Sequence, residues 1–189
     1  MNIAIVGATG NVGRKTLEVL EKKGLTLGNL YLVASSKSAG KKIHFQGKDI
    51  VVSELENFDF SKVKIAFFAA GGKISEKFAE KAAKHCLVID NSSFFRMDPD
   101  VPLIVPQVNS DDLNNVKKNI IANPNCSTAQ LVIALKPLHD LFVIKRIVVS
   151  TYQSVSGAGK ASMDELIKQT KLALDGKAVS YTHLTLPTK

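Results

Sequence analysis

The chain has 189 residues, of which 45% are hydrophobic and 22% charged, and its formal net charge at pH 7 is +8. This composition excludes a disordered chain, a collagen and a small disulfide scaffold. No apolar run reaches the length of about 18 residues that a transmembrane helix needs, so no membrane association is expected. No basic region precedes the apolar residues 3–6, so no signal peptide is expected. Cys86 and Cys126 are therefore predicted to be free thiols of a cytoplasmic protein.

The positive charge comes almost entirely from lysine. Only Arg14, Arg96 and Arg146 are arginines among the 25 basic residues, and the lysines are spread along the chain. Because arginine is the favoured side chain for reading bases and phosphates of a polynucleotide, this pattern favours a solvated lysine surface over nucleic-acid binding. A small anionic ligand remains compatible with the charge.

The first half alternates short apolar runs with helical patterns, as βαβ units do, so the predicted fold class is α/β with a Rossmann-type parallel sheet. The expected strands are residues 2–6, 31–34, 49–52, 65–68 and 87–89, and the expected helices are residues 11–23 and 73–85. In the first helix, Val12, Thr16, Val19 and Leu20 are predicted to share one side.

The pattern changes after residue 91. Three prolines within residues 92–110 predict a long ordered loop with one short strand at 103–105. The elements expected beyond it are strands at 119–122 and 145–152 and helices at 128–141 and 163–174.

Three glycines separate the first expected strand from the first expected helix. Residues 7–13 read Gly-Ala-Thr-Gly-Asn-Val-Gly. Glycines at a strand-to-helix turn let the backbone approach a ligand, and the helix N-terminus presents free N–H groups to a phosphate. This context predicts a dinucleotide site, although any tight turn can use glycines.

The segment after the second expected strand suggests which dinucleotide binds. Residues 34–41 read Ala-Ser-Ser-Lys-Ser-Ala-Gly-Lys and contain no acid that could accept from a ribose 2′-OH. The hydroxyls and Lys37 suit a 2′-phosphate instead, so NADP is favoured over NAD. An ordinary polar turn is the alternative.

Cys126 lies in Asn-Pro-Asn-Cys-Ser-Thr, residues 123–128, at the start of an expected apolar helix. The dipole and free amides of a helix N-terminus stabilise a thiolate and an oxyanion formed beside it, so Cys126 is a candidate nucleophile that Asn125 could help to orient. The alternative is a core cysteine, which is the prediction for Cys86 at the start of a buried strand.

Arg96 is a candidate anion anchor, or else an ordinary surface arginine. A nicotinamide cofactor with a nucleophilic cysteine indicates interconversion of an aldehyde and an acyl group.

These segments resemble the aspartate-semialdehyde dehydrogenase family over nearly all of residues 1–160. The matching segments are GATGNVG at 7–13, ASSKSAGK at 34–41, DNSSFFRMDPDVPLIVPQVN at 90–109, NPNCST at 123–128 and STYQSVSGAG at 150–159. The resemblance implies an NADP-dependent enzyme of lysine, threonine, methionine and diaminopimelate biosynthesis that acts as a homodimer or a dimer of dimers.

The resemblance also implies roles for individual residues. The residues implied to line the NADP pyrophosphate are Thr9, Gly10, Asn11 and Val12, and Gly7 and Gly13 of the same loop also count as cofactor-binding. Those implied to hold the 2′-phosphate are Ser35, Lys37 and Ser38. The family often has arginine where Lys37 stands. Ser156 and Gly157 approach the nicotinamide end. Gln153 and Asn125 bind the substrate, Arg96 binds its phosphate or free phosphate, and no metal is implied.

In the implied reaction, the Cys126 thiolate attacks the acyl carbon of aspartyl 4-phosphate while Arg96 stabilises the departing phosphate. Hydride from NADPH then reduces the thioester, and aspartate 4-semialdehyde leaves. The family's acid–base histidine lies in a later segment, and none of His44, His85, His139 and His183 stands in that context. We therefore assign none of the four.

Family chains are about twice this long, so this chain is expected to be an N-terminal part with little or no activity alone. The predicted division is an NADP-binding domain at 1–127, the beginning of an α+β catalytic and dimerisation domain at 128–178, and an atypical tail at 179–189 that resembles foreign read-through or an engineering scar. Two alternatives remain, a non-catalytic NADP-binding module and an N-acyl-glutamyl-phosphate reductase.

Overall fold

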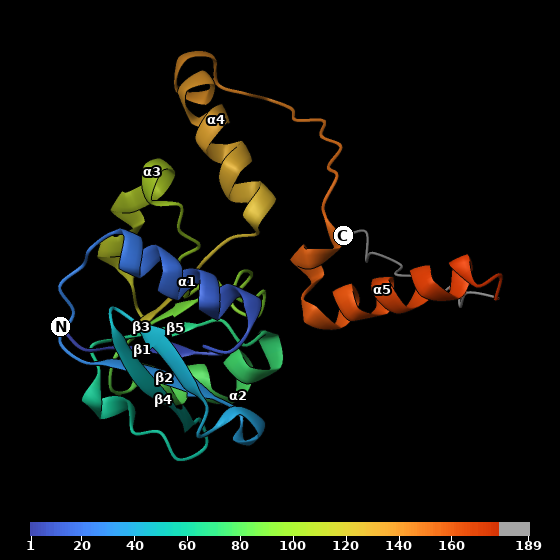
Figure 1. Cartoon of the computed structure of the whole chain (residues 1–189). Helices are drawn as coiled ribbons and strands as arrows, with labels where there is room; N and C mark the ends of the chain where they lie inside the picture. The colour runs from blue at the N-terminus through green and yellow to red at the C-terminus, as the bar shows by residue number, and fades with distance from the viewer. Residues whose placement is uncertain (178–189) are drawn as a thin grey trace. The chain divides into compact units, whose positions relative to one another are not determined.

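The computed structural model describes residues 1–177. These residues fall into two compact units, Met1–Val148 and a second that begins at Val149, and each is described by itself (Figure 1). The segment 179–189, which we expected to be foreign, lies outside the described residues. The boundary expected at residues 127 and 128 stays a prediction.

The first unit is built on a seven-stranded sheet with the strand order β3-β4-β2-β1-β5-β6-β7. The strands are β1 (Ile3–Val6), β2 (Leu30–Ala34), β3 (Lys42–Phe45), β4 (Lys48–Glu54), β5 (Ile65–Phe68), β6 (Leu87–Asp90) and β7 (Ile120–Ala122). Every pair of neighbours is parallel except β3 and β4, which form a hairpin. The predicted Rossmann-type parallel sheet is therefore confirmed.

The helices of the first unit are α1 (Asn11–Lys22), α2 (Gly72–Ala83), the short α3 (Pro106–Asn109) and α4 (Cys126–Phe142). The second unit contains the 3-10 helix η4 (Val155–Ala158) and helix α5 (Lys160–Leu174). The expected helices are all present, with ends that differ from the predicted ones by a few residues.

The core consists of two clusters that involve alternate residues of the central strand β1. Ala4 and Val6 belong to the cluster that includes Phe78 of α2, whereas Ile5 belongs to the cluster that includes Leu17 and Leu20 of α1. All four residues of β1 are buried because neighbouring strands flank it and both of its faces are covered.

Four details of the prediction were wrong. Residues 103–105 form no strand, because only Leu103 makes an isolated bridge, to Ala122 of β7. The antiparallel strand β3 was missed, because it has only four residues and two of them, Lys42 and His44, are polar and exposed. Residues 145–152 form no strand, and within the described residues no strand pairs with them. The side of α1 was misplaced in part. Leu20 is buried as expected, but Val12 and Val19 are 46% and 47% exposed while Gly13 and Leu17 are buried.

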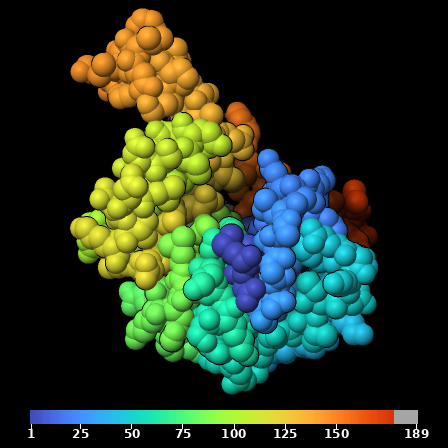
Figure 2. All heavy atoms as spheres, turned by 90° about the vertical axis from the view of Figure 1, so that its left-hand side faces the viewer, coloured from blue at the N-terminus to red at the C-terminus, as the bar shows by residue number. Residues whose placement is uncertain are grey.

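The parallel strands place all their carboxyl ends at one edge of the sheet. Figure 2 shows the N-terminal residues (dark blue) in the middle of one face, with blue and cyan residues on one side of them and green and yellow-green residues on the other. The loops that follow β1, β2, β5, β6 and β7 therefore meet at the carboxyl edge, where open α/β sheets bind ligands.

Candidate functional site

The carboxyl edge has a topological switch point between β1 and β5. The chain leaves β1 toward its neighbour β2 on one side, and it later returns to β5 on the other side of β1. At such a point the loops diverge and leave a crevice for a ligand. The glycine-rich segment 7–13 follows β1 directly, so it lies at this point.

The three glycines of this segment are glycines for different structural reasons. Gly7 has a φ of +86°, and a Cβ there would lie 2.7 Å from the carbonyl oxygen of Ala69. A Cβ on Gly13 would overlap the carbonyl oxygen of Gly7, so the start of α1 packs directly on the loop. Gly10 has an ordinary φ of −80°, and its Cβ would meet nothing closer than 3.4 Å. Gly7 and Gly13 therefore satisfy internal packing, whereas Gly10 leaves space at the surface of the loop.

The N-terminus of α1 is open to an anion. Its N-cap is Gly10, which makes no side-chain cap, and the first turn contains no acidic residue. The first turn of a helix has N–H groups without intrahelical acceptors and a positive dipole end. Asn11 and Val12 are exposed at this turn. The turn has the chemistry of a phosphate-binding site.

The loop after β2 lies beside the glycine loop. Thr9 Oγ1 lies 3.4 Å from Ser38 Oγ, so the structure brings together the two segments predicted to bind the dinucleotide. Ser35 and Lys37 are exposed in the short helical turn Ser36–Ser38 and its N-cap. A phosphate held there would meet two hydroxyls and an ammonium group.

Sequence reasoning missed the loop that follows β5. Residues 69–72 read Ala-Ala-Gly-Gly and lead into α2, whose N-cap Gly71 has a φ of +88°. The close approach of Ala69 to Gly7 places this loop against the glycine loop. The signal was present, because a Gly-Gly pair directly after a buried strand indicates a second ligand-facing turn.

Cys126 is the first residue of α4, and its side chain is exposed. The N-cap is Asn125, whose Oδ1 accepts from Ser127 N at 2.9 Å and from Ser127 Oγ at 2.7 Å. The Cys126 thiol lies 3.7 Å from the same oxygen. Asn125 thus orders the first turn of the helix around the sulfur, which matches the predicted surroundings of a nucleophile.

Arg96 lies against the segment that leads into Cys126. Its Nε donates to the carbonyl of Asn123 at 2.9 Å, and its Nη2 lies 3.4 Å from the carbonyl of Asn91. The amide of Asn123 in turn donates to Asn91 Oδ1. These bonds occupy two of the five N–H groups of a guanidinium, so the others remain for an anion. Arg96, Asn125 and Cys126 are therefore gathered at one place on the carboxyl edge.

Gln153, Ser156 and Gly157 belong to the second unit. The Gln153 side chain lies against Gly157, where an added Cβ would overlap its Nε2. Ser156 Oγ lies 2.6 Å from Ser154 Oγ. All three residues are exposed. The structure brings them together with one another, and their relation to Cys126 stays a prediction.

Cys86 lies at the opposite, amino edge of the sheet and is confirmed as a core residue. It is 6% exposed and donates to the carbonyl of Ala82 at 3.4 Å. Burial raises the pKa of its thiol to about 11. A buried thiol of this kind is a poor nucleophile at neutral pH.

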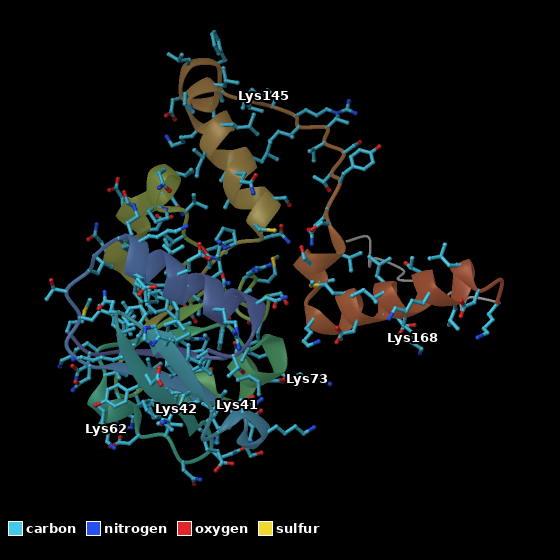
Figure 3. The ribbon with its side chains drawn as sticks, viewed as in Figure 1. Lys41, Lys42, Lys62, Lys73, Lys145 and Lys168 are labelled. Atoms are coloured by element: carbon cyan, nitrogen blue, oxygen red, sulfur yellow. The ribbon has the colours of Figure 1, made fainter. Side chains whose placement is uncertain are left out.

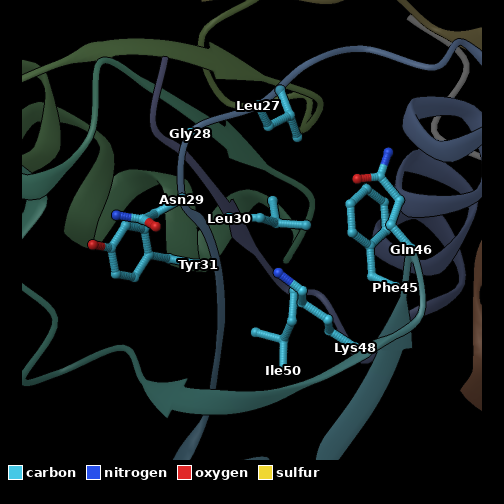
Figure 4. Close-up of a pocket in the computed structure, with 9 residues that line it drawn as sticks. All are labelled: Leu27, Gly28, Asn29, Leu30, Tyr31, Phe45, Gln46, Lys48 and Ile50. Carbon is cyan, nitrogen blue, oxygen red and sulfur yellow. The ribbon is translucent and has the colours of Figure 1, made fainter.

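A cavity of about 600 Å³ also opens at the amino edge (Figure 4). It is lined by the residues that enter β2 and by the β3–β4 turn, among them Leu30, Tyr31, Phe45, Gln46 and Lys48. Because ligands of open α/β sheets bind at the carboxyl ends of the strands, this cavity is separate from the candidate site.

Nearly all lysines within residues 1–177 are exposed and they come from different elements, as Lys41, Lys62 and Lys73 illustrate (Figure 3). Within residues 1–177, no group of three His, Cys, Asp or Glu side chains is arranged to hold a metal. No helix among these residues is both long and apolar enough to cross a membrane.

Comparison with known proteins matches two family models. The model described as semialdehyde dehydrogenase, NAD binding domain, matches residues 2–116. The model described as semialdehyde dehydrogenase, dimerisation domain, matches residues 135–188, and thus includes most of the atypical tail.

Comparison with individual proteins agrees with the two family models. An aspartate-semialdehyde dehydrogenase of Rickettsia bellii is 53% identical over 172 residues, which are 90% of this chain and 51% of that protein. The structure of aspartate semialdehyde dehydrogenase II of Vibrio cholerae, complexed with ASA, matches with a TM-score of 0.89 and 51% identity over 95% of this chain and 54% of that one. An aspartate semialdehyde dehydrogenase of Candida albicans, solved with NADP, matches with a TM-score of 0.63 and 30% identity over 76% of this chain and 48% of that one.

This chain spans about half the length of the curated relatives it matches. The expected resemblance is confirmed by the family model that covers more than half of the chain. The chain belongs to the semialdehyde dehydrogenase family.

Proposed function

We propose that this chain carries the NADP site and the cysteine nucleophile of an aspartate-semialdehyde dehydrogenase. The reaction is the NADPH-dependent reductive dephosphorylation of L-aspartyl 4-phosphate to L-aspartate 4-semialdehyde. The observation that carries the proposal is the gathering of an open helix N-terminus, an arginine and an exposed cysteine at one edge of the sheet. The Rickettsia and Vibrio relatives, which bear this enzyme's name, support it.

The chain fits a dinucleotide phosphate. Gly10 leaves space in front of the uncapped first turn of α1, and Thr9, Asn11 and Val12 are its neighbours in the chain. Ser35, Lys37 and Ser38 supply hydroxyls and a positive charge for a 2′-phosphate, and the nearby segment contains no acid to repel it. The loop that sequence reasoning missed, Ala69–Gly72, forms a third wall of the proposed dinucleotide site. When bound, NADPH supplies the hydride that the reduction needs.

Cys126 forms the covalent intermediate. Its sulfur attacks the acyl carbon of the substrate, a carbon–sulfur bond forms, and the carbon–oxygen bond to the phosphate breaks, so that free phosphate leaves with the bonding pair. The amides at the start of α4 stabilise the oxyanion formed on the attacked carbon. Asn125 holds this turn and orients the substrate. Arg96 binds the phosphate before and after it leaves.

The second unit contributes substrate and cofactor contacts. Gln153 orients the substrate, and Ser156 and Gly157 approach the nicotinamide end of NADP. Support for these roles comes from the family segment STYQSVSGAG at 150–159. The Gln153 side chain already lies against Gly157, so the two act as one local structure.

We assign the general acid–base to none of the described histidines. His44 pairs with Asp49 at 3.0 Å on the exposed β3–β4 hairpin, and His85 lies at the amino edge. His139 is in the last turn of α4, away from the N-terminal turn that holds Cys126. The proton transfers of the complete reaction therefore require a group supplied from elsewhere.

The proposed assembly is a homodimer or a dimer of dimers in the cytoplasm. The match to the dimerisation model supports it. So does the run of exposed apolar side chains at the end of α4 and beyond it, where Leu141, Phe142 and Val148 are each at least 75% exposed. Exposed apolar groups at this density mark an interaction surface.

The decisive assay follows NADP reduction by aspartate semialdehyde and phosphate. It compares the chain alone with a chimera in which the remaining part of the Vibrio cholerae enzyme follows residue 177. We expect the chimera to be active and its Cys126→Ala variant to be inactive, with Cys86→Ala as the matched control that keeps activity. A folded chimera that binds NADP and lacks activity would instead indicate a non-catalytic binding module.

A further inference from the structure

Asp90 is a buried carboxylate to which neither the sequence nor the proposed reaction gives a role. It is the last residue of β6, and its relative exposure is 0%. No ion pair of Asp90 occurs among the described residues. Because a buried polar group without hydrogen-bond partners is costly, the donors around Asp90 are what allow it to stay inside the protein.

Three donors surround this carboxylate. Ser75 Oγ donates to Oδ1 at 2.6 Å and Ser92 N donates to the same oxygen at 3.1 Å. Ser92 Oγ donates to Oδ2 at 2.7 Å and accepts from Phe94 N at 3.1 Å. Asp90 therefore anchors the beginning of the loop that carries Arg96 and ties it to α2.

The backbone of Asp90 reaches the other half of the site. Its carbonyl accepts from Asn123 N at 2.8 Å. The carbonyl of Asn123 accepts from Arg96 Nε, and the side chain of Asn123 donates to Asn91 Oδ1. Asp90 thus stands where the Arg96 loop and the segment before Cys126 are joined.

We propose that Asp90 is a positioning residue, whose carboxylate holds the loop 91–96 so that the Arg96 guanidinium is fixed beside the segment leading to Cys126. The proposal rests on the proposed function, because it takes Arg96 as the anchor of the substrate phosphate. Without the hydrogen bonds that Asp90 accepts, the loop is free to rotate, and Arg96 then loses its bond to Asn123 and its orientation.

An Asp90→Asn variant breaks this arrangement with almost no change in size. An amide nitrogen then faces the Ser92 hydroxyl in place of an acceptor, so the Ser92 hydrogen has no partner there. The matched control is Asp98→Asn. Asp98 is also a loop carboxylate with polar donors, Asp100 N at 2.9 Å and Lys118 Nζ at 2.9 Å, and no bond joins it to Arg96.

The readout is the arginine Nε–H signal in nitrogen-15 NMR spectra of the chain as it stands. The chain has only Arg14, Arg96 and Arg146, so each signal can be assigned by substitution. Hydrogen exchange of the Arg96 Nε–H reports its bond to Asn123, and titration with inorganic phosphate reports its anion affinity. NADP affinity, measured on the same samples, reports the glycine loop.

We expect Asp90→Asn to speed exchange of the Arg96 Nε–H and to weaken phosphate binding about tenfold, while NADP affinity stays unchanged. Asp98→Asn should change neither. A folded Asp90→Asn protein with wild-type exchange and phosphate affinity would overturn the proposal. If Asp90→Asn does not fold, Ser92→Ala, which removes one donor to the carboxylate, is judged by the same two results.

The Arg96→Lys variant separates this proposal from the proposed function. Phosphate affinity that does not depend on Arg96 would contradict the anion role in the proposed function. The exchange rate of the Arg96 Nε–H in Asp90→Asn would still decide whether Asp90 positions that side chain.

Discussion

The same parallel strands form both edges of the sheet, yet the two edges present different chemistry. At the carboxyl edge, α1 begins with an uncapped turn after Gly10, and α4 begins at the exposed Cys126 with a turn that Asn125 caps. At the amino edge, Cys86 is buried and a cavity of about 600 Å³ lies among the entering turns. Strand direction therefore locates the candidate site better than the presence of a cavity does, because it determines which edge receives the helix N-termini.

The largest expected difference between the edges is the reactivity of the two thiols. At pH 8 we expect iodoacetamide to modify Cys126 at least about 100-fold faster than Cys86, because burial both shields Cys86 and lowers its thiolate fraction. Mass spectrometry of the two cysteine peptides against time measures the ratio. In urea the rates should converge, and similar rates in the folded protein would contradict the comparison.

Substitutions of Gly13 and Gly10 at the carboxyl edge test which of these glycines is needed for packing of the loop. Gly13→Ala should lower the free energy of unfolding by about 2–3 kcal/mol, because its Cβ overlaps the Gly7 carbonyl and the backbone must shift. Gly10→Ala has room for the methyl group and should change stability by less than about 0.5 kcal/mol. Urea denaturation followed by circular dichroism measures both. Equal losses in the two variants would mean that Gly10 also serves packing.

Cys86, at the amino edge, should make the free energy of unfolding of the protein sensitive to alkaline pH. Its pKa is raised in the folded state from an ordinary 9.0 to about 11, so the stability it contributes is complete below pH 9 and is lost as pH rises toward 11. The expected loss is up to about 2 kcal/mol. Urea denaturation at several pH values measures it against Cys86→Ala, which lacks the thiol. The same pH slope in both proteins would show that other groups cause it.

The smallest expected effect concerns the turn that closes the amino edge. Gln46 and Gly47 join β3 to β4 with φ values of +46° and +77°. Asparagine tolerates this left-handed region better than glutamine, so Gln46→Asn should raise the free energy of unfolding by about 0.5 kcal/mol. The contact to Glu21 uses the backbone N–H of residue 46, so it survives the substitution. Gln46→Val is the opposite control, because a β-branched residue disfavours a positive φ and should lower the free energy of unfolding. A valine variant more stable than the wild type would contradict this account.

The central sheet could be predicted from the sequence because its strands are continuous apolar runs between turn residues. Residues 3–6 and 65–68 are examples, and both became strands. The side of α1 could not be predicted from apolar spacing alone. The contact point of that helix is Gly13, a residue without a side chain, and its approach to Gly7 rotates Val12 and Val19 outward.

The candidate site was partly predictable for the same reason. The glycine loop, Arg96 and Cys126 lie in the segments that follow three apolar strands, and parallel topology brings the ends of those strands to one edge. The bond from Arg96 to Asn123 joins residues 27 positions apart, and it depends on the placement of β6 beside β7. No spacing rule reveals such a contact. Residues 145–152 alternate like a strand, but a strand also needs a neighbour, which local pattern does not supply.

The most direct test of the account is calorimetric titration of the chain with NADP and with NAD. We expect NADP to bind about tenfold more tightly than NAD, Lys37→Ala to remove most of that difference, and Gly10→Ala to weaken both. A folded chain that binds neither dinucleotide, or binds both equally well with Gly10→Ala in place, would contradict the assignment of the carboxyl edge as the cofactor site.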